Sequence, residues 1–204
     1  MKKFQNKLNL TLKIIISLFG VGLFIASLIN PTAWPKTMSY LVTIILPFAP
    51  DIIKLFGLNT STRLQIAFSL FLGLAMVMGI DFDLYKTWYI FGNPCFDKIA
   101  HVSSGVLAAF IAREIIERNY DGIDIKVTGS KARVKHYDTR FVWLFIVSFV
   151  GLTAIAWECF EFLYDQITGG TMQTLIADGI DDTMWDMLGA LVAGIITAFP
   201  LSKK

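Results

Sequence analysis

The side chains best suited to chemistry are three carboxylates near the end of a long apolar run. Glu158, Glu161 and Asp165 are spaced i, i+3 and i+7, so on a helix they lie on one face. The run that carries them begins near Phe141. Ionised groups are costly inside a bilayer, so carboxylates in a membrane helix are by default a functional-site hypothesis.

Two further pairs of polar residues have helical spacing. Asp97 and His101 form one i, i+4 pair, and Asp182 and Asp186 form another, each near the start of an apolar stretch. Consecutive membrane helices run in opposite directions, so the end of one helix and the starts of its neighbours lie at the same side of the membrane. We therefore expect the three groups to converge at one end of a helix bundle.

One imidazole and several carboxylates are ligands suited to a divalent metal such as Zn, Mn or Mg. We expect His101, Glu161 and Asp186 to bind the ion and to be the catalytic residues. A metal with an open coordination position could activate water against a substrate. Three more acids are candidate metal-site residues that orient these ligands from a second layer: Asp97, Glu158 and Asp182.

Other interpretations of the same residues stay open. Without a metal, His101 would act as a general base oriented by Asp97 or Glu161. The polar groups could instead form a structural hydrogen-bond network, in which Asp97 and Asp182 cap helix N-termini. A three-histidine zinc site is excluded, because the second and last histidine, His136, falls in a polar loop.

The composition indicates a membrane protein that positions these groups on helices. Hydrophobic residues make up 55% of the 204 residues and charged residues only 17%, whereas soluble domains carry about 25% charged residues. A net charge of +2 gives no sign of nucleic-acid binding. Cys95 and Cys159 are too few for a disulfide framework or a thiolate zinc site.

The predicted fold class is all-α, a bundle of six transmembrane helices in one membrane domain. A helix needs about 20 residues to cross the hydrocarbon. The first apolar stretch is longer than that of a signal peptide, so we expect it to be retained, and we expect the second to kink at Pro47 and Pro50. The stretches lie at about 12–29, 38–56, 64–80, 98–116, 141–165 and 183–200.

The distribution of basic residues predicts the orientation. If the N-terminus is cytoplasmic, 15 of the 18 Lys and Arg residues, Lys13 among them, fall inside, and only Lys36, Lys86 and Lys98 fall outside. Positively charged loops are retained in the cytoplasm. We therefore expect both termini inside and the polar cluster at the outer side.

Two loops and two groups of helices complete the prediction. Residues 81–96 are rich in aromatic side chains, and we expect this loop to be interfacial or partly re-entrant. Residues 119–139 form a basic cytoplasmic loop, in which the alternating stretches 123–127 and 132–136 suggest a β-hairpin. Helices within 1–80 would be a scaffold, and those within 81–200 a functional core joined through small residues.

Three sequence blocks resemble a known family. Asp97-Lys98-x-x-His101-x-x-x-Gly105, Trp157-Glu158-x-x-Glu161-x-x-x-Asp165 and Asp182-Thr183-x-Trp185-Asp186 are similar to those of the YjdF-like bacterial inner-membrane proteins. VanZ-like membrane proteins share the Asp-Lys-x-x-His helix start. The resemblance runs from about residue 81 to 194. It implies a multi-pass protein of the bacterial plasma membrane, and the VanZ-like link to glycopeptide tolerance points to the cell envelope.

The function expected from these observations is a site, facing outward, that acts on a lipid-linked or cell-envelope substrate, with a divalent metal as cofactor. Membrane lipids are the expected partners, and nucleic acid is not. The first alternative is a cation- or proton-coupled transporter, although Asp51 is the one acid near the inner end of a span. The second is a non-enzymatic structural or regulatory membrane protein.

Overall fold

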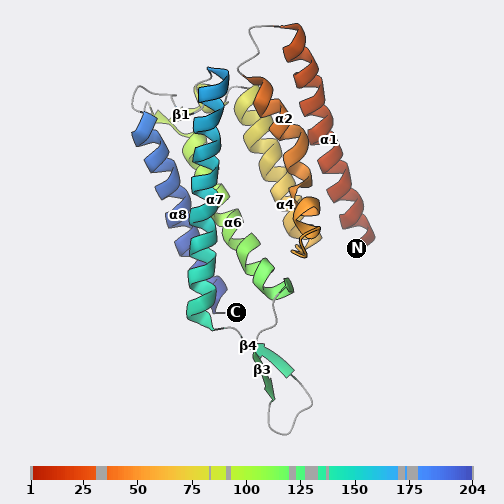
Figure 1. Ribbon diagram of the computed structural model, residues 1–204, viewed down its shortest axis with the longest axis vertical. Coiled ribbons are helices and arrows are strands. Elements are labelled where there is room, and N and C mark those ends of the chain that lie inside the picture. The colour runs from red at the N-terminus through yellow and green to blue at the C-terminus, as the bar shows by residue number, and fades with distance from the viewer. Residues whose placement is uncertain are drawn as a thin grey trace.

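The computed structural model describes residues 2–30, 36–82, 84–90, 93–119, 123–126, 133–136, 138–169, 173 and 179–203. It is mainly a bundle of long helices, with short strand pairs outside the bundle (Figure 1). Within the described ranges, five helices are long and apolar enough to cross a membrane. They are α1 (Lys2–Ile29), α4 with its extension η3 (Thr62–Ile80), α6 (Phe96–Asn119), α7 (Thr139–Thr168) and, within α8 (Gly179–Ser202), Ile180–Ser202.

The second predicted span is a broken helix. It consists of α2 (Thr37–Ile45), a 3-10 turn η2 (Leu46–Phe48) and α3 (Ala49–Lys54). The breaks fall at Pro47 and Pro50, because proline has no N–H to donate and its ring clashes with the preceding turn. The predicted kink is therefore present, but a single uninterrupted helix over 38–56 is not.

The third predicted span changes from an α-helix to a π-helix about halfway along its length. Ser61 caps α4 (Thr62–Leu72) by accepting a hydrogen bond from the N–H of Leu64 at 3.3 Å. From Gly73 to Asp81 the chain continues as a π-helical segment, η3. A Cβ at Gly79 would overlap the ring of Tyr85, so glycine allows that ring to lie against the helix backbone.

Helices α6, α7 and α8 pack directly on one another (Figure 1). Small residues permit the close approach that the sequence predicted: a Cβ at Gly105 would overlap the backbone of Ala190, and one at Gly194 would meet the side chain of Val150. Ala109 and Val142 are fully buried in the core that these helices share. Tight packing of small side chains holds membrane helices together where no hydrophobic effect operates.

Helices α1, α2 and α4 pack together and form a second group beside the first group, α6, α7 and α8. The two groups meet mainly where α4 contacts α6. The N- and C-termini lie at the same end of the bundle, on the side where strands β3 and β4 are found (Figure 1). α6 begins, α7 ends and α8 begins at the opposite end (Figure 1). The residues at the start of α6, the end of α7 and the start of α8 therefore lie far from both termini (Figure 1).

The connecting segments contain two short antiparallel strand pairs among the described residues. β3 (Ile123–Lys126) pairs with β4 (Arg133–His136), as the alternating pattern suggested, although Val127 and Ala132 lie outside the described residues. In the aromatic loop, α5 (Leu84–Thr87) is followed by β1 (Tyr89–Ile90), which pairs with β2 (Asn93–Pro94).

Candidate functional site

A cluster of one histidine and several carboxylates lies where α6, α7 and α8 meet. Asp97 and His101 come from the first turns of α6, Glu158 from the second half of α7, and Asp182 and Asp186 from the first turns of α8. Asp97, His101, Glu158 and Asp186 are buried, and Asp182 is partly buried. The convergence expected from antiparallel helices is therefore present.

The imidazole of His101 is the centre of the cluster. Its Nε2 lies 3.5 Å from Oδ1 of Asp97 and 3.8 Å from Oδ2 of Asp186, and its Nδ1 lies 3.7 Å from Oε1 of Glu158. These four side chains are between 3% and 11% exposed. One ligand atom each from Asp97, His101 and Asp186 lies within 4.8 Å of the other two.

Lys98 connects the two acids of α8, a role that the sequence analysis missed. Its Nζ donates to Oδ1 of Asp182 at 2.5 Å and to Oδ1 of Asp186 at 2.7 Å, and lies 3.5 Å from Oδ2 of Asp97. The available signal was a lysine three residues before a histidine, on the side of the bundle for which the sequence predicted only three bases. Asp97 and Asp182 lie inside the first turns of their helices and not at the cap positions.

Glu161, a predicted ligand, has a different partner. Its Oε1 accepts a hydrogen bond of 2.6 Å from Nε1 of Trp157, one turn earlier on α7. The structure groups Asp97, instead of Glu161, with His101 and Asp186. Ligation by Glu161 therefore stays a prediction.

Asp165 is linked to α8 through hydrogen bonds of Gln173. An Oδ2 of Asp165 accepts from the backbone N–H of Gln173 at 2.9 Å, and the side-chain amide of Gln173 donates to Oγ1 of Thr183 at 3.1 Å. Asp165 is thus linked to α8 through Gln173. Asp178 lies outside the described residues.

Tyr85 approaches the cluster from α5. Its ring packs edge-on against Phe96, with ring centroids 5.0 Å apart. Burial, together with the nearby carboxylates of Asp97, Glu161 and Asp186, raises the pKa of its hydroxyl far above the usual value. The phenol therefore stays neutral and can donate a hydrogen bond beside the carboxylates.

A second polar cluster lies toward the other end of the bundle. Nζ of Lys13 donates to Oδ2 of Asp51 at 2.7 Å and to Oε1 of Gln65 at 3.0 Å, and the amide of Asn9 donates to the same Gln65 oxygen at 2.8 Å. The side chain of Lys13 is 2% exposed. Lys13, which the sequence placed on the cytoplasmic side, therefore lies within α1 and is buried against α3 and α4 instead of extending into a loop.

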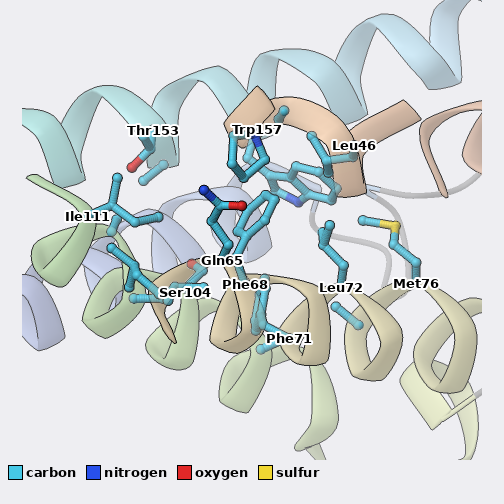
Figure 2. A pocket seen from close by; sticks show the side chains of 18 of the residues that line it. Leu46, Gln65, Phe68, Phe71, Leu72, Met76, Ser104, Ile111, Thr153 and Trp157 are labelled. Atoms are coloured by element: carbon cyan, nitrogen blue, oxygen red, sulfur yellow. The ribbon is translucent and has the colours of Figure 1, made fainter. Parts of the chain in front are cut away.

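A cavity of about 380 Å³ lies between the two groups of helices. Figure 2 shows side chains from α4, α6 and α7 directed into it, including Phe68, Ile111 and Trp157. At one end its wall includes Gln65, which binds Lys13, and at the other end it includes His101. The cavity therefore extends from one polar cluster to the other.

Long apolar helices that enclose a buried polar cluster define a multi-pass membrane protein. Over residues 10–203 the chain matches the model of the family described as "Predicted membrane protein (DUF2238)", and it belongs to that family. No curated protein and no solved structure matches the chain.

Proposed function

We propose that the chain crosses the bacterial plasma membrane six times, with both termini in the cytoplasm and the His101 cluster at the outer side. The excess of Lys and Arg in the segments assigned to the cytoplasm supports this orientation. The two termini at one end of the bundle are consistent with an even number of crossings (Figure 1). The broken segment Thr37–Lys54 would be the second crossing, and the resemblance to YjdF-like proteins supports the bacterial location.

The His101 cluster is proposed to bind a divalent metal and to act on a lipid or cell-envelope substrate. The observation that carries this proposal is the position of Nε2 of His101, which faces two carboxylates at 3.5 and 3.8 Å. A charge-assisted hydrogen bond is shorter, about 2.7–2.9 Å. Two ligands about 2.1 Å from one ion lie at most about 4.2 Å apart, so both distances suit a shared ion.

The neighbouring groups have complementary roles in this proposal. Oε1 of Glu158 lies 3.7 Å from Nδ1 of His101, and in this proposal it would receive the Nδ1–H of a neutral imidazole, which leaves the Nε2 lone pair free for the ion. Lys98 partly neutralises Asp182 and Asp186, so the acids of α8 do not repel one another. A bound ion would supply Lewis acidity and a more acidic bound water. One nitrogen and several oxygen ligands fit Zn, Mn or Mg.

Metal content measured on purified protein tests this proposal. Wild-type protein and His136→Ala, which removes the histidine of β4, are expected to bind close to one equivalent of Zn or Mn after loading and desalting. His101→Ala is expected to retain less than about a tenth of that amount while still folding. No bound Zn, Mn or Mg in folded wild-type protein would overturn the proposal.

Cation- or proton-coupled transport is the second candidate function. One observation favours it: Gln65, which binds the Lys13–Asp51 pair, and His101 line the same cavity. Intramembrane ionisable residues are typical of ion and proton pathways. Transport predicts uptake by proteoliposomes that is lost equally in Asp51→Asn and Glu161→Gln, whereas a site confined to the outer end predicts no uptake.

A further inference from the structure

The cavity between the two groups of helices ends at the proposed metal site. His101, Tyr85 and Trp157 form part of its wall. Nε2 of His101 faces the carboxylates of Asp97 and Asp186, and Nε1 of Trp157 donates to Glu161. A molecule that fills the cavity therefore brings one end next to the polar cluster.

The remainder of the cavity wall offers little hydrogen bonding to a guest. The hydroxyl of Ser104 donates to the carbonyl of His101 at 2.7 Å, and that of Thr153 donates to the carbonyl of Val150 at 2.9 Å. The other residues between the two ends are apolar, and they include Phe68, Leu72, Phe71, Leu107, Ala108 and Phe149. A hydrated ion or polar solute would lose hydrogen bonds there, at a cost of several kcal/mol, whereas a hydrocarbon chain would not.

The cavity is long enough to hold a hydrocarbon chain from one leaflet of a bilayer. Its lining residues on α6 extend from Ala100 to Ile111, and those on α4 and η3 extend from Leu64 to Met76. At about 1.5 Å per residue, these stretches are about 16 and about 18 Å long. Half of the hydrocarbon core is about 15 Å. Because α4 and α6 run along the bundle, the cavity extends from the His101 cluster to Gln65, beside the Lys13–Asp51 pair.

We propose that this cavity binds one hydrocarbon chain of a membrane lipid, with the polar end of the lipid at His101 and the chain directed toward Ile111 and Leu64. This proposal rests on the proposed function and names its substrate class as a lipid with a long chain. The apolar middle of the cavity is the observation on which the inference depends. It favours a hydrocarbon chain as the guest over the polar solute or ion that a transporter would move. The lipid is held by its chain, and its head is presented to the metal site.

Photo-crosslinking at two depths tests the proposal in vesicles that contain the full-length protein. Two phosphatidylglycerol probes are used, one with a diazirine near the headgroup and one with a diazirine at the chain end. The first is expected to label residues near Met76 and Tyr85, and the second residues near Leu64 and Ile111. Labelling confined to outward-facing residues such as Leu70 and Leu144, the same for both probes, would overturn the proposal.

A pair of variants on α7 provides the matched control. Ala154→Phe fills the cavity, whereas Ile155→Phe makes a similar change at the next residue, which is 52% exposed on the outer face of the bundle. Ala154→Phe is expected to reduce cavity labelling at least fivefold, and Ile155→Phe to leave it unchanged. Equal labelling of both folded variants would contradict the proposal.

The two proposals fail in different ways. Neither variant changes a proposed metal ligand, so both are expected to retain wild-type metal content. Cavity labelling without bound metal would support the lipid site and reject the metal site, and bound metal without cavity labelling would do the reverse. Mass analysis of lipids extracted from the purified protein distinguishes an acyl from an isoprenoid chain; either supports the proposal, and a delipidated cavity that binds neither when lipids are added back overturns it.

Discussion

Oε1 of Glu158 lies 3.7 Å from Nδ1 of His101 and is buried without a hydrogen-bond partner among the described residues. An unpaired buried carboxylate oxygen is costly, so it needs a donor. An Nδ1–H on the imidazole can serve as this donor, and it would turn the Nε2 lone pair toward Asp97 and Asp186. The proposed metal site follows from this orientation of the ring.

Glu158→Gln is expected to weaken metal binding without removing a ligand. The amide keeps the size of the side chain but loses the charge that makes the imidazole more basic, and changes of this kind cost about 10–100-fold in metal affinity. Titration of metal-free protein with Zn or Mn measures the effect. Unchanged affinity in the folded variant would show that Glu158 does not orient His101.

Lys98→Met is expected to destabilise the metal-free protein. Nζ of Lys98 makes charge-assisted hydrogen bonds to Asp182 and Asp186, and loss of such bonds costs about 1.5–3 kcal/mol. A divalent ion should restore part of the lost stability, because it balances the same carboxylates. Thermal unfolding in detergent with and without metal tests this; if metal has no effect on either protein, the cluster is a structural network.

The Lys13–Asp51 pair is expected to respond unequally to loss of its two members. The side chain of Lys13 is 2% exposed and that of Asp51 is 55% exposed. Asp51→Asn leaves a buried ammonium without its charge partner, which costs about 3–5 kcal/mol, whereas Lys13→Met leaves a carboxylate that water can reach. Equal losses of unfolding free energy in the two variants would contradict this arrangement.

Gly105→Ala is expected to separate α6 from α8 and to lower stability by about 2 kcal/mol or more, because overpacking of this kind typically costs about 1–3 kcal/mol. A Cβ at Gly105 would overlap the backbone of Ala190, which has no freedom to rotate away. Gly22→Ala is the matched control, because no atom lies within 4 Å of the added Cβ, and it should stabilise α1 by up to about 1 kcal/mol. Similar effects of both substitutions on thermal unfolding would refute the close contact.

Glu161→Gln is expected to abolish the activity proposed for the outer site in cells while the protein remains folded. Glu161 lies one turn beyond Trp157 and accepts a hydrogen bond from Nε1 of that residue. The substitution preserves this hydrogen bond, so only the charge is lost. Full function in cells with the folded variant would remove Glu161 from the proposed catalytic residues.

The ends of the helices and their convergence could be predicted from the sequence, because apolar length and charge distribution are local properties of the chain. The predicted convergence is therefore present, and it includes Asp97, His101, Glu158 and Asp186. The partners within the cluster could not be predicted, because the rotation of each helix about its axis is set by packing at contacts such as Gly105 against Ala190. Helical spacing alone places Asp97 beside His101, whereas packing of α8 on α6 brings Asp186 to Nε2 of His101 and leaves Glu161 bonded to Trp157.

The buried ion pair was missed for a similar reason. In the sequence, Lys13 follows a basic N-terminal segment and looks like one more of the residues that keep that end of the helix in the cytoplasm. Only contact between α1, α3 and α4 shows that Lys13 has a partner inside the bundle. The cavity was equally invisible to sequence patterns, because apolar residues that line a cavity and those that face lipid have the same composition.

The most direct measurement of the central claim is pulsed electron paramagnetic resonance of the protein loaded with Mn²⁺. Ligation by Nε2 of His101 predicts a nitrogen hyperfine coupling in wild-type protein and in His136→Ala. The same coupling is expected to be absent in His101→Ala. A Mn²⁺ signal without nitrogen coupling in folded wild-type protein would contradict the metal site.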